Sequence, residues 1–306
     1  MRWRQLEAFR ETMITGTARG AAEIMGISQP AVSRLLEGLE EALKITLFDR
    51  TTGRLVPTPE AQLFYAELPR AFASYDRLRT VAEDIRFGRK GSLHVATMPA
   101  LGLGFLPDTI AEYAKVQPDV KIRYDMQLSM RVEELVSAQM VDLGIAEFPF
   151  ERPGFEREDF CRIPYVMALP EDHPLAERSV ITPLDLDGQD MVSLCAETVA
   201  RRLLDTCLSN AGVTPHILYE TTFSAGICTL VQRGMGIGLV DMFTAHDFHG
   251  KSLVFRRFEP DMVFHVGILY PRHQPISRTA SGFVAALRAR RNRVLAKSQR
   301  SLGYNV

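Results

Sequence analysis

Residues 28–34 combine side chains that could read the edges of DNA bases. Glutamine can pair with adenine and arginine with guanine in the major groove, while serine or proline allows a close approach. Serine is a favourable helix N-cap and proline is tolerated in the first turn, so a helix beginning here would present polar groups and a phosphate-binding N-terminus. A plain capped helix would show the same spacing. The candidate DNA contacts are Ser28, Gln29, Pro30, Ser33 and Arg34.

Three more residues are candidate DNA contacts because of the elements around them. Thr17 can cap a short helix over residues 18–25, and a turn at Gly26 separates this helix from the next. Two short helices joined by a glycine-containing turn are the components of a helix-turn-helix. Arg50 and Arg54 lie near the ends of a glycine turn between two short strands, which predicts a wing that contacts phosphates.

A second set of polar residues lies where predicted strands end, in the C-terminal two thirds of the chain. Ligands of open α/β sheets bind beyond these ends, where helix N-termini point. Hydroxyls and backbone amides there could hold a carboxylate, and two acids could hold a cation, which favours a zwitterion such as an amino acid or its derivative. The acids could equally cap helices or face water. The candidate ligand contacts are Thr97, Met98, Pro99, Glu147, Ser193, Thr198 and Asp241.

The usual constellations of catalytic and metal centres do not occur in the sequence. The seven histidines are scattered, no nucleophile stands beside a base, and the glycines of residues 234–238 precede an apolar run, the reverse of a dinucleotide-binding loop. The four cysteines have no metal-ligand spacing and are expected to be reduced thiols. We therefore expect no enzyme, metal or cofactor. The alternative is a solute-binding protein or an enzyme with an appended helical domain.

Apolar periodicity predicts the elements that position these residues. Helical spacing extends over residues 3–14 and 32–43, and a long helix follows Thr58 and Pro59. The long helix either packs on its own domain or pairs two chains, and its place between two domains favours a partner chain. Its heptad seam consists of Phe64, Leu68, Ala71, Tyr75, Leu78, Ala82 and Ile85.

From Ser92 onward, short β-branched runs alternate with amphipathic helices. This alternation predicts an α/β fold with a mostly parallel sheet, arranged as two lobes with crossing segments. The expected strands cover residues 93–97, 120–126, 143–146, 165–169, 191–194, 216–220, 237–240 and 264–270, and the helices 105–117, 131–139, 199–210, 225–233 and 277–297.

Length and composition limit the class of protein. A chain of 306 residues suggests about two domains, and 46% hydrophobic with 24% charged residues is typical of soluble globular proteins. The net charge of −1 shows no overall basic excess, and residues 1–60 hold eight basic and eight acidic side chains. The total charge therefore does not indicate DNA binding, and the evidence for it must come from where the basic side chains lie. The charged N-terminus lacks a signal-peptide core and no run could span a membrane, so we expect a cytoplasmic protein without membrane contact.

The N-terminal motif resembles the winged helix-turn-helix of LysR-type transcriptional regulators. The resemblance covers residues 1–60 by motif and the whole chain by length and layout. Lys44 and Ala61 stand where the family commonly has glycine. The matching residues are Ala21-Ala22, Ser28 to Arg34, Leu39-Glu40, Leu43, Leu47 to Arg50 and Pro57-Thr58.

The resemblance implies a division of labour along the chain. Residues 1–60 would form the DNA-binding domain, 61–90 the linker helix and hinge, and 91–306 a two-lobed α/β effector domain like a periplasmic binding protein. It also implies a double-stranded DNA operator, a homodimer through the linker helix, a homotetramer, contact with RNA polymerase, and a small effector between the lobes.

The C-terminal region is similar to the amino-acid- and opine-responsive branch, which contains the lysine-biosynthesis, nopaline and octopine regulators. The similar stretches are residues 97–99 with 105–107, 142–147 and 234–238. This resemblance implies diaminopimelate-like or opine effectors, with contacts at Thr97, Met98, Glu147, Ser193 and Asp241. A small aromatic or organic acid is the alternative effector.

Overall fold

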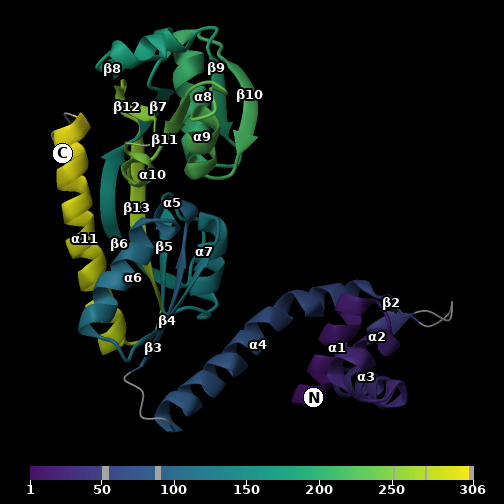
Figure 1. Ribbon diagram of the computed structural model, residues 1–306. Helices are drawn as coiled ribbons and strands as arrows, with labels where there is room; N and C mark the ends of the chain where they lie inside the picture. The colour runs from purple at the N-terminus through teal and green to yellow at the C-terminus, as the bar shows by residue number, and fades with distance from the viewer. Residues whose placement is uncertain (50–54, 87–90, 251, 273, 303–306) are drawn as a thin grey trace. The chain divides into compact units, whose positions relative to one another are not determined.

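The computed structural model describes residues 1–49, 55–86, 91–250, 252–272 and 274–302 (Figure 1). The chain divides into two units, Met1–Thr80 and Val81–Val306, each with a hydrophobic core of its own. Within the described residues, no helix is both long enough and apolar enough to cross a membrane.

Three short helices and a hairpin build the N-terminal unit. Each helix turns an apolar stripe toward one core, as the helical spacing predicts. Phe9 is fully buried at its centre, with the ring of Phe48 edge-on at 5.6 Å. The elements are α1 (Trp3–Thr15), α2 (Ala18–Met25), α3 (Gln29–Leu43), β1 (Phe48–Asp49) and β2 (Val56–Pro57).

Local capping sets the limits of these helices. Gly16 and Gly26 end α1 and α2 in the left-handed region, at φ 70° and 63°. The hydroxyl of Thr17 accepts the N–H of Gly20 at 3.0 Å, which confirms the predicted cap of α2. Ser28 takes the N-cap position of α3 with an extended backbone, but its side chain makes no capping bond.

Lys44 ends α3 in the left-handed region, at φ 56°. This conformation costs a residue with a Cβ roughly 1 kcal/mol. Lys44→Gly should therefore raise the free energy of unfolding of this unit by up to about 1 kcal/mol. Urea unfolding of the full chain, followed by the fluorescence of Trp3, the sole tryptophan, measures the change. Glu41→Gly, inside the helix, should instead lower the free energy; an equal loss in both variants contradicts the account.

The predicted hairpin lies beside α3. β1 and β2 pair antiparallel, with Phe48 opposite Pro57 and Asp49 opposite Val56. One carboxylate oxygen of Glu40 on α3 accepts the N–H groups of residues 47 and 48 at 2.7 and 3.0 Å. This side chain therefore fixes the start of the wing to the helix that precedes it.

The long helix α4 (Pro59–Arg86) begins at the cap formed by Thr58, as predicted. Leu68 and Phe72 on this helix are buried in the N-terminal core, and the ring of Trp3 lies 4.4 Å from that of Phe72. The first part of the predicted seam therefore packs on its own domain.

The first lobe of the C-terminal unit contains a five-stranded sheet with the order β4-β3-β5-β13-β6. The first three strands are parallel, whereas β13 runs antiparallel to both β5 and β6. The strands are β3 (Ser92–Thr97), β4 (Lys121–Met126), β5 (Leu143–Glu147), β6 (Phe155–Pro164) and β13 (Val263–Pro271), and the helices are α5 (Pro99–Gly102), α6 (Phe105–Val116) and α7 (Ser129–Ser137).

The second lobe contains a four-stranded sheet with the order β11-β7-β12-β8, and a parallel pair of β9 and β10 joined to it by a bridge between Met191 and Ile237. Short 3-10 turns, Pro174–Glu177 and Pro183–Leu186, flank β8. The elements are β7 (Val166–Pro170), β8 (Val180–Ile181), β9 (Asp190–Leu194), α8 (Val199–Ala211), β10 (His216–Thr221), α9 (Ser224–Val231), β11 (Gly238–Val240), α10 (Met242–Phe248) and β12 (Leu253–Phe258).

Two crossing segments join the lobes, at residues 164–166 and 258–263. They are bonded to each other, because the N–H of Tyr165 donates to the carbonyl of Met262 at 2.8 Å. The Tyr165 ring is buried and lies 5.3 Å from Phe264. The predicted two-lobed α/β architecture with crossing segments is confirmed.

The basic C-terminal helix α11 (Arg278–Leu302) lies along α6 and β6 of the first lobe (Figure 1). Arg288 pairs with Glu158 of β6 at 2.5 Å, and Arg290 pairs with Glu112 of α6 at 2.8 Å. The positive charge of this helix is therefore largely used to hold it on its own domain.

The expectation of a mostly parallel sheet is wrong. β13 returns from the second lobe and so enters the first sheet antiparallel, and β7 pairs antiparallel with both β11 and β12. Five elements have no counterpart among the predicted ranges: α5, β6, β8, α10 and β12. β6 is an edge strand in which charged residues interrupt the apolar run, so it lacks the continuous hydrophobicity of a buried strand.

Candidate functional site

The N-terminal half of α3 exposes the residues predicted to contact DNA. Ser28, Gln29, Pro30 and Arg34 are exposed and Ser33 is half-buried. The opposite face of the helix is buried in the core. Because Ser28 leaves its hydroxyl out of the helix cap, this group is available for a phosphate or base. The surface offers one arginine, one amide and two hydroxyls at a helix N-terminus.

Of the other three residues predicted to contact DNA, only Thr17 belongs to the described part of the chain. Thr17 is exposed at the start of α2, where its hydroxyl caps the helix. Arg50 and Arg54 lie outside the described residues.

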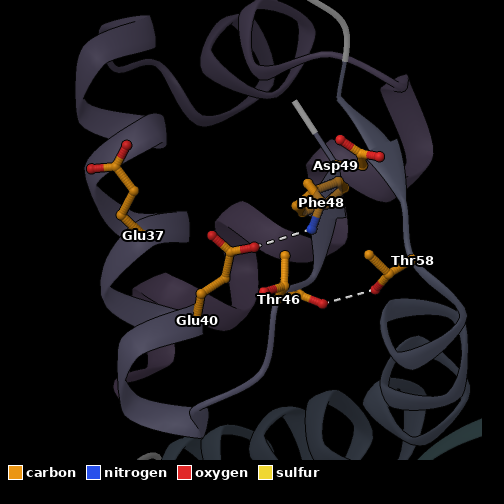
Figure 2. Close-up of a pocket in the computed structure, with 6 residues that line it drawn as sticks. All are labelled: Glu37, Glu40, Thr46, Phe48, Asp49 and Thr58. Atoms are coloured by element: carbon orange, nitrogen blue, oxygen red, sulfur yellow. Dashed lines mark hydrogen bonds between the residues drawn. The ribbon is translucent and has the colours of Figure 1, made fainter. Parts of the chain in front are cut away.

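A hollow beside α3 has the wrong charge for a DNA contact. It lies between α3 and the hairpin (Figure 2). Three carboxylates contribute to its lining, and these repel a phosphate. DNA contacts are thus expected at the N-terminal half of the helix and not at this hollow. The lining residues are Glu37, Glu40, Thr46, Phe48, Asp49 and Thr58.

Glu147 lies at the end of β5, where the first lobe meets the crossing segments. Its carboxylate accepts the hydroxyl of Tyr165 at 2.6 Å, and its backbone N–H donates to the hydroxyl of Ser129 at 3.0 Å. Burial raises the pKa of Glu147 to about 7, the Tyr165 hydrogen bond lowers it, the charge of Asp241 raises it and that of Arg202 lowers it. A partly buried acid under these opposing influences is typical of a binding site.

Asp241 is only 1% exposed and caps α10. Its two carboxylate oxygens accept the N–H and the hydroxyl of Thr244, each at 2.8 Å, and Ser224 also bonds to it. Burial raises the pKa of Asp241, and these bonds lower it. Asp241 is therefore a helix cap, as the alternative interpretation of the sequence expected. Its carboxylate is occupied, so we expect it to influence a ligand only indirectly, by raising the pKa of Glu147.

Of the other residues predicted to contact the ligand, Thr97, Met98 and Pro99 belong to the same lobe as Glu147. Thr97 is fully buried and its hydroxyl donates to the carbonyl of Met98 at 3.2 Å. The N–H of Met98 donates to the carbonyl of Ile145 at 2.9 Å, and its sulfur lies 3.9 Å from the Ser129 hydroxyl. Pro99 follows at the start of α5, partly buried. This group thus borders β5 and Glu147.

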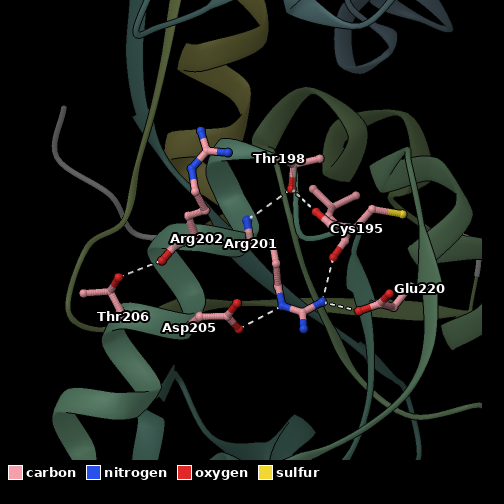
Figure 3. Close-up of polar contacts among 8 residues, drawn as sticks. Cys195, Thr198, Arg201, Arg202, Asp205, Thr206 and Glu220 are labelled. Carbon is pink, nitrogen blue, oxygen red and sulfur yellow. Dashed lines mark hydrogen bonds and ion pairs between the residues drawn. The ribbon is translucent and has the colours of Figure 1, made fainter.

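Ser193 and Thr198 belong to the second lobe. Ser193 is 2% exposed on β9. The Thr198 hydroxyl donates to the carbonyl of Cys195 at 2.8 Å and accepts the N–H of Arg201 at 3.3 Å, so it caps α8 (Figure 3). Its hydroxyl is already engaged, which leaves little capacity to hold a carboxylate.

Two residues outside the predicted site, Ser129 and Tyr165, form hydrogen bonds with Glu147, and the charge of a third, Arg202, lowers its pKa. Ser129 follows the end of β4, so the strand-end rule could have found it. Tyr165 lies in a crossing segment and Arg202 in the first turns of a helix, and neither position carries a local signal. Among the described residues, no group of three or more His, Cys, Asp or Glu is placed to hold a metal ion.

Comparison with known protein families covers almost the whole chain. Residues 3–62 match the family described as bacterial regulatory helix-turn-helix protein, lysR family, and residues 87–292 match the LysR substrate binding domain.

Three curated relatives are similar over most of their length. Regulatory protein NocR of Agrobacterium tumefaciens (strain T37) is 37% identical over 284 residues, which cover 93% of this chain and 95% of NocR. The transcriptional activator protein LysR of Escherichia coli (strain K12) is 35% identical, covering 94% and 92%. The octopine catabolism/uptake operon regulatory protein OccR of Rhizobium meliloti is 34% identical, covering 84% and 85%.

Solved structures share the fold. CbnR, a LysR family transcriptional regulator, has a TM-score of 0.74 at 18% identity, covering 95% of this chain and 99% of CbnR. Full-length CbnR in complex with its target DNA has a TM-score of 0.75 at the same identity, covering 95% and 100%.

Proposed function

We infer the function from one premise, that this chain belongs to the lysR family of bacterial regulatory helix-turn-helix proteins, and is a regulator and not an enzyme. We propose that it binds a double-stranded DNA operator and controls transcription in the cytoplasm, in response to a small effector and without a cofactor. The effector is an amino acid or a derivative of one, bound between the two lobes of residues 91–306.

The position of Glu147 carries the proposal for the effector class. A partly buried carboxylate at the boundary between two lobes, already bonded to Tyr165, is stabilised in its ionised form by a cationic ligand group. A plain aromatic acid would add a second negative charge there, which costs free energy. The relative whose name specifies octopine catabolism and uptake supports a derivative of a cationic amino acid.

We propose the following roles for the effector-contact residues expected from the sequence. Glu147 would meet the cation, while Met98, Pro99 and Ser193 would border the ligand. Thr97, Thr198 and Asp241 would shape the site through the hydrogen bonds they already make.

For DNA, we propose that residues 1–60 bind the operator with Thr17, Ser28, Gln29, Pro30, Ser33 and Arg34, together with Arg50 and Arg54 of the wing. The exposed start of α3 supports this proposal. A helix of this kind reads bases while its neighbours contact phosphates.

We further propose that residues 61–90 pair two chains and that dimers join as tetramers. Leu78 on α4 is 69% exposed, which leaves this seam position available for a second chain, whereas Tyr75 is 43% exposed and stacks one face of its ring on Trp3 at 4.2 Å. A two-fold dimer suits a two-fold DNA site. The effector then acts by binding one arrangement of the subunits more tightly than another, which changes contact with RNA polymerase.

A thermal-shift experiment on the full chain tests the effector class. Octopine, L-arginine and L-lysine should raise the melting temperature, because saturation at 100 times the dissociation constant stabilises a protein by about 2.7 kcal/mol. Benzoate, as a plain aromatic acid, should leave it unchanged. Stabilisation by benzoate, with none of the amino acids effective, contradicts the proposal and favours an aromatic-acid effector.

A further inference from the structure

The long helix α4 carries a proline in its interior, Pro69. Proline has no backbone N–H, so the helix loses a hydrogen bond there and its two halves are less firmly joined. The half before Pro69 packs on the centre of the N-terminal core, where the rings of Phe64 and Tyr65 lie 5.5 and 6.4 Å from that of Phe9. The direction of the half after Pro69 therefore depends on other contacts.

Those contacts come from one face of α1. The ring of Trp3 lies 4.4 Å from that of Phe72 and stacks on that of Tyr75 at 4.2 Å, with 21° between the two planes. The indole N–H donates to the carboxylate of Glu7, one turn along α1, at 2.9 Å, which fixes the orientation of the ring. Arg10 lies a further turn along and places its guanidinium 4.1 Å from the centre of the Phe72 ring. One face of α1 thus holds the part of α4 that follows the proline.

Trp3 makes the outermost of these contacts. Leu68 and Phe72 are 3% and 9% exposed, whereas Tyr75 is 43% exposed and Leu78 is 69% exposed. Among the side chains of α4 that the structure describes, packing on the N-terminal core therefore ends at the ring that stacks on Trp3. Helices α1 and α3 pack on each other in that core. The Trp3 stack consequently fixes the direction of α4 relative to α3, the helix that exposes the predicted DNA contacts.

We propose that Trp3 is a positioning residue for operator recognition, because it fixes the separation at which two paired chains present their α3 helices. This inference rests on the proposed pairing of two chains through residues 61–90. In such a pair, the direction of α4 in each chain determines where each α3 helix lies. A duplex can then contact both helices only if its half-sites have the matching separation. Trp3 acts through α4 and not by contact with DNA.

Operator duplexes with altered half-site separation test this role. Two base pairs are inserted or removed between the half-sites of an operator that the wild type selects from random duplexes. Each change moves one half-site by about 7 Å and turns it by about 70° around the duplex. In gel-shift titrations of the full chain, the wild type should prefer the original duplex by about 100-fold, since the altered duplexes prevent simultaneous contact.

Trp3→Ala should reduce this preference to about 10-fold or less, because α4 can then leave the N-terminal core in more than one direction. A sharp preference at a new separation would also show that Trp3 sets the separation. Trp3→Leu keeps much of the apolar volume without the ring and should have the same effect, which secures the test if Trp3→Ala is unstable. Trp3→Phe keeps a ring against Tyr75 and should retain most of the preference.

Ala21→Gly supplies the control for a loss of stability alone. Ala21 is fully buried inside α2, and glycine there weakens the helix without removing an aromatic contact. This variant should lower the affinity for every duplex by the same factor and leave the preference unchanged. If Trp3→Ala and Trp3→Leu also keep the full preference of the wild type, Trp3 only stabilises the N-terminal unit and the inference is overturned.

The failure of the proposed pairing has a different signature. If the wild type binds the original and the altered duplexes equally, or sediments as a monomer, the pairing of two chains through α4 is rejected, and the role of Trp3 is rejected with it. If the wild type sediments as a dimer or tetramer and prefers one separation, the pairing stands whatever the Trp3 variants do.

Discussion

Glu147→Gln should weaken the binding of a cationic effector by at least about 30-fold at pH 8, while the effector-free protein becomes more stable. The amide has the same shape and still accepts the hydroxyl of Tyr165, so the packing of the site is preserved. What is lost is the negative charge, which the effector needs and which burial penalises when no effector is bound.

The direction of the pH dependence follows from the pKa of Glu147, which burial raises from 4.5 to about 7. Below about pH 4.5 the group is neutral in both folded and unfolded chains, so it does not affect stability. Between about pH 4.5 and 7 the unfolded chain is ionised while the folded protein still holds the proton, so the folded protein loses up to about 3 kcal/mol relative to its stability at low pH, and this loss stays constant above about pH 7. Affinity for a cationic effector should rise over the same range, since binding needs the ionised form.

Melting temperatures at pH 5 and 8, with calorimetry at pH 6 and 8, separate the two effects. The wild type should gain affinity with pH, and Glu147→Gln should show no such gain but melt higher than the wild type at pH 8. Tyr165→Phe removes a bond that lowers the pKa of Glu147, so its affinity should rise at a higher pH. Glu156→Gln, an exposed acid, is the control. If Glu147→Gln binds the effector as tightly as the wild type, Glu147 does not contact the cationic group of the effector.

Sequence reasoning was most successful where the structure is local. The limits of α2 depend on Thr17 and Gly26, whose cap and turn are formed by residues three or four positions away. The exposed face of α3 follows from a stripe of apolar residues at helical spacing. Such features need no knowledge of the rest of the fold.

The ligand site was harder to predict because distant segments build it. Glu147 was found because it ends a strand, but its partner Tyr165 lies in a crossing segment whose position depends on both sheets. Asp241 also ends a strand, and there the hydroxyl and N–H of Thr244 make it a cap. A strand-end acid alone cannot distinguish these outcomes, because the difference lies in which neighbours the folded chain supplies.

Arg34→Ala should lower specific operator affinity by about 10- to 100-fold and leave effector affinity unchanged. Arg34 is exposed in the N-terminal half of α3, the same half that carries Gln29 and Ser33. Residues 1–60 have no excess of basic over acidic side chains, so electrostatic attraction to DNA of arbitrary sequence is weak. Each arginine that faces the groove therefore contributes a larger share of the operator affinity.

Gel-shift titrations on an operator selected from random duplexes measure the loss, at two salt concentrations and against a scrambled duplex. Arg34→Lys keeps the charge but not the fork that pairs with guanine, so it should lose operator affinity and retain affinity for the scrambled duplex. Arg4→Ala removes an exposed charge from α1 and is the control. If Arg34→Lys equals the wild type on the operator, Arg34 contacts a phosphate and base reading falls to Gln29 and its neighbours. If Arg34→Ala also equals the wild type, the start of α3 is not the recognition surface.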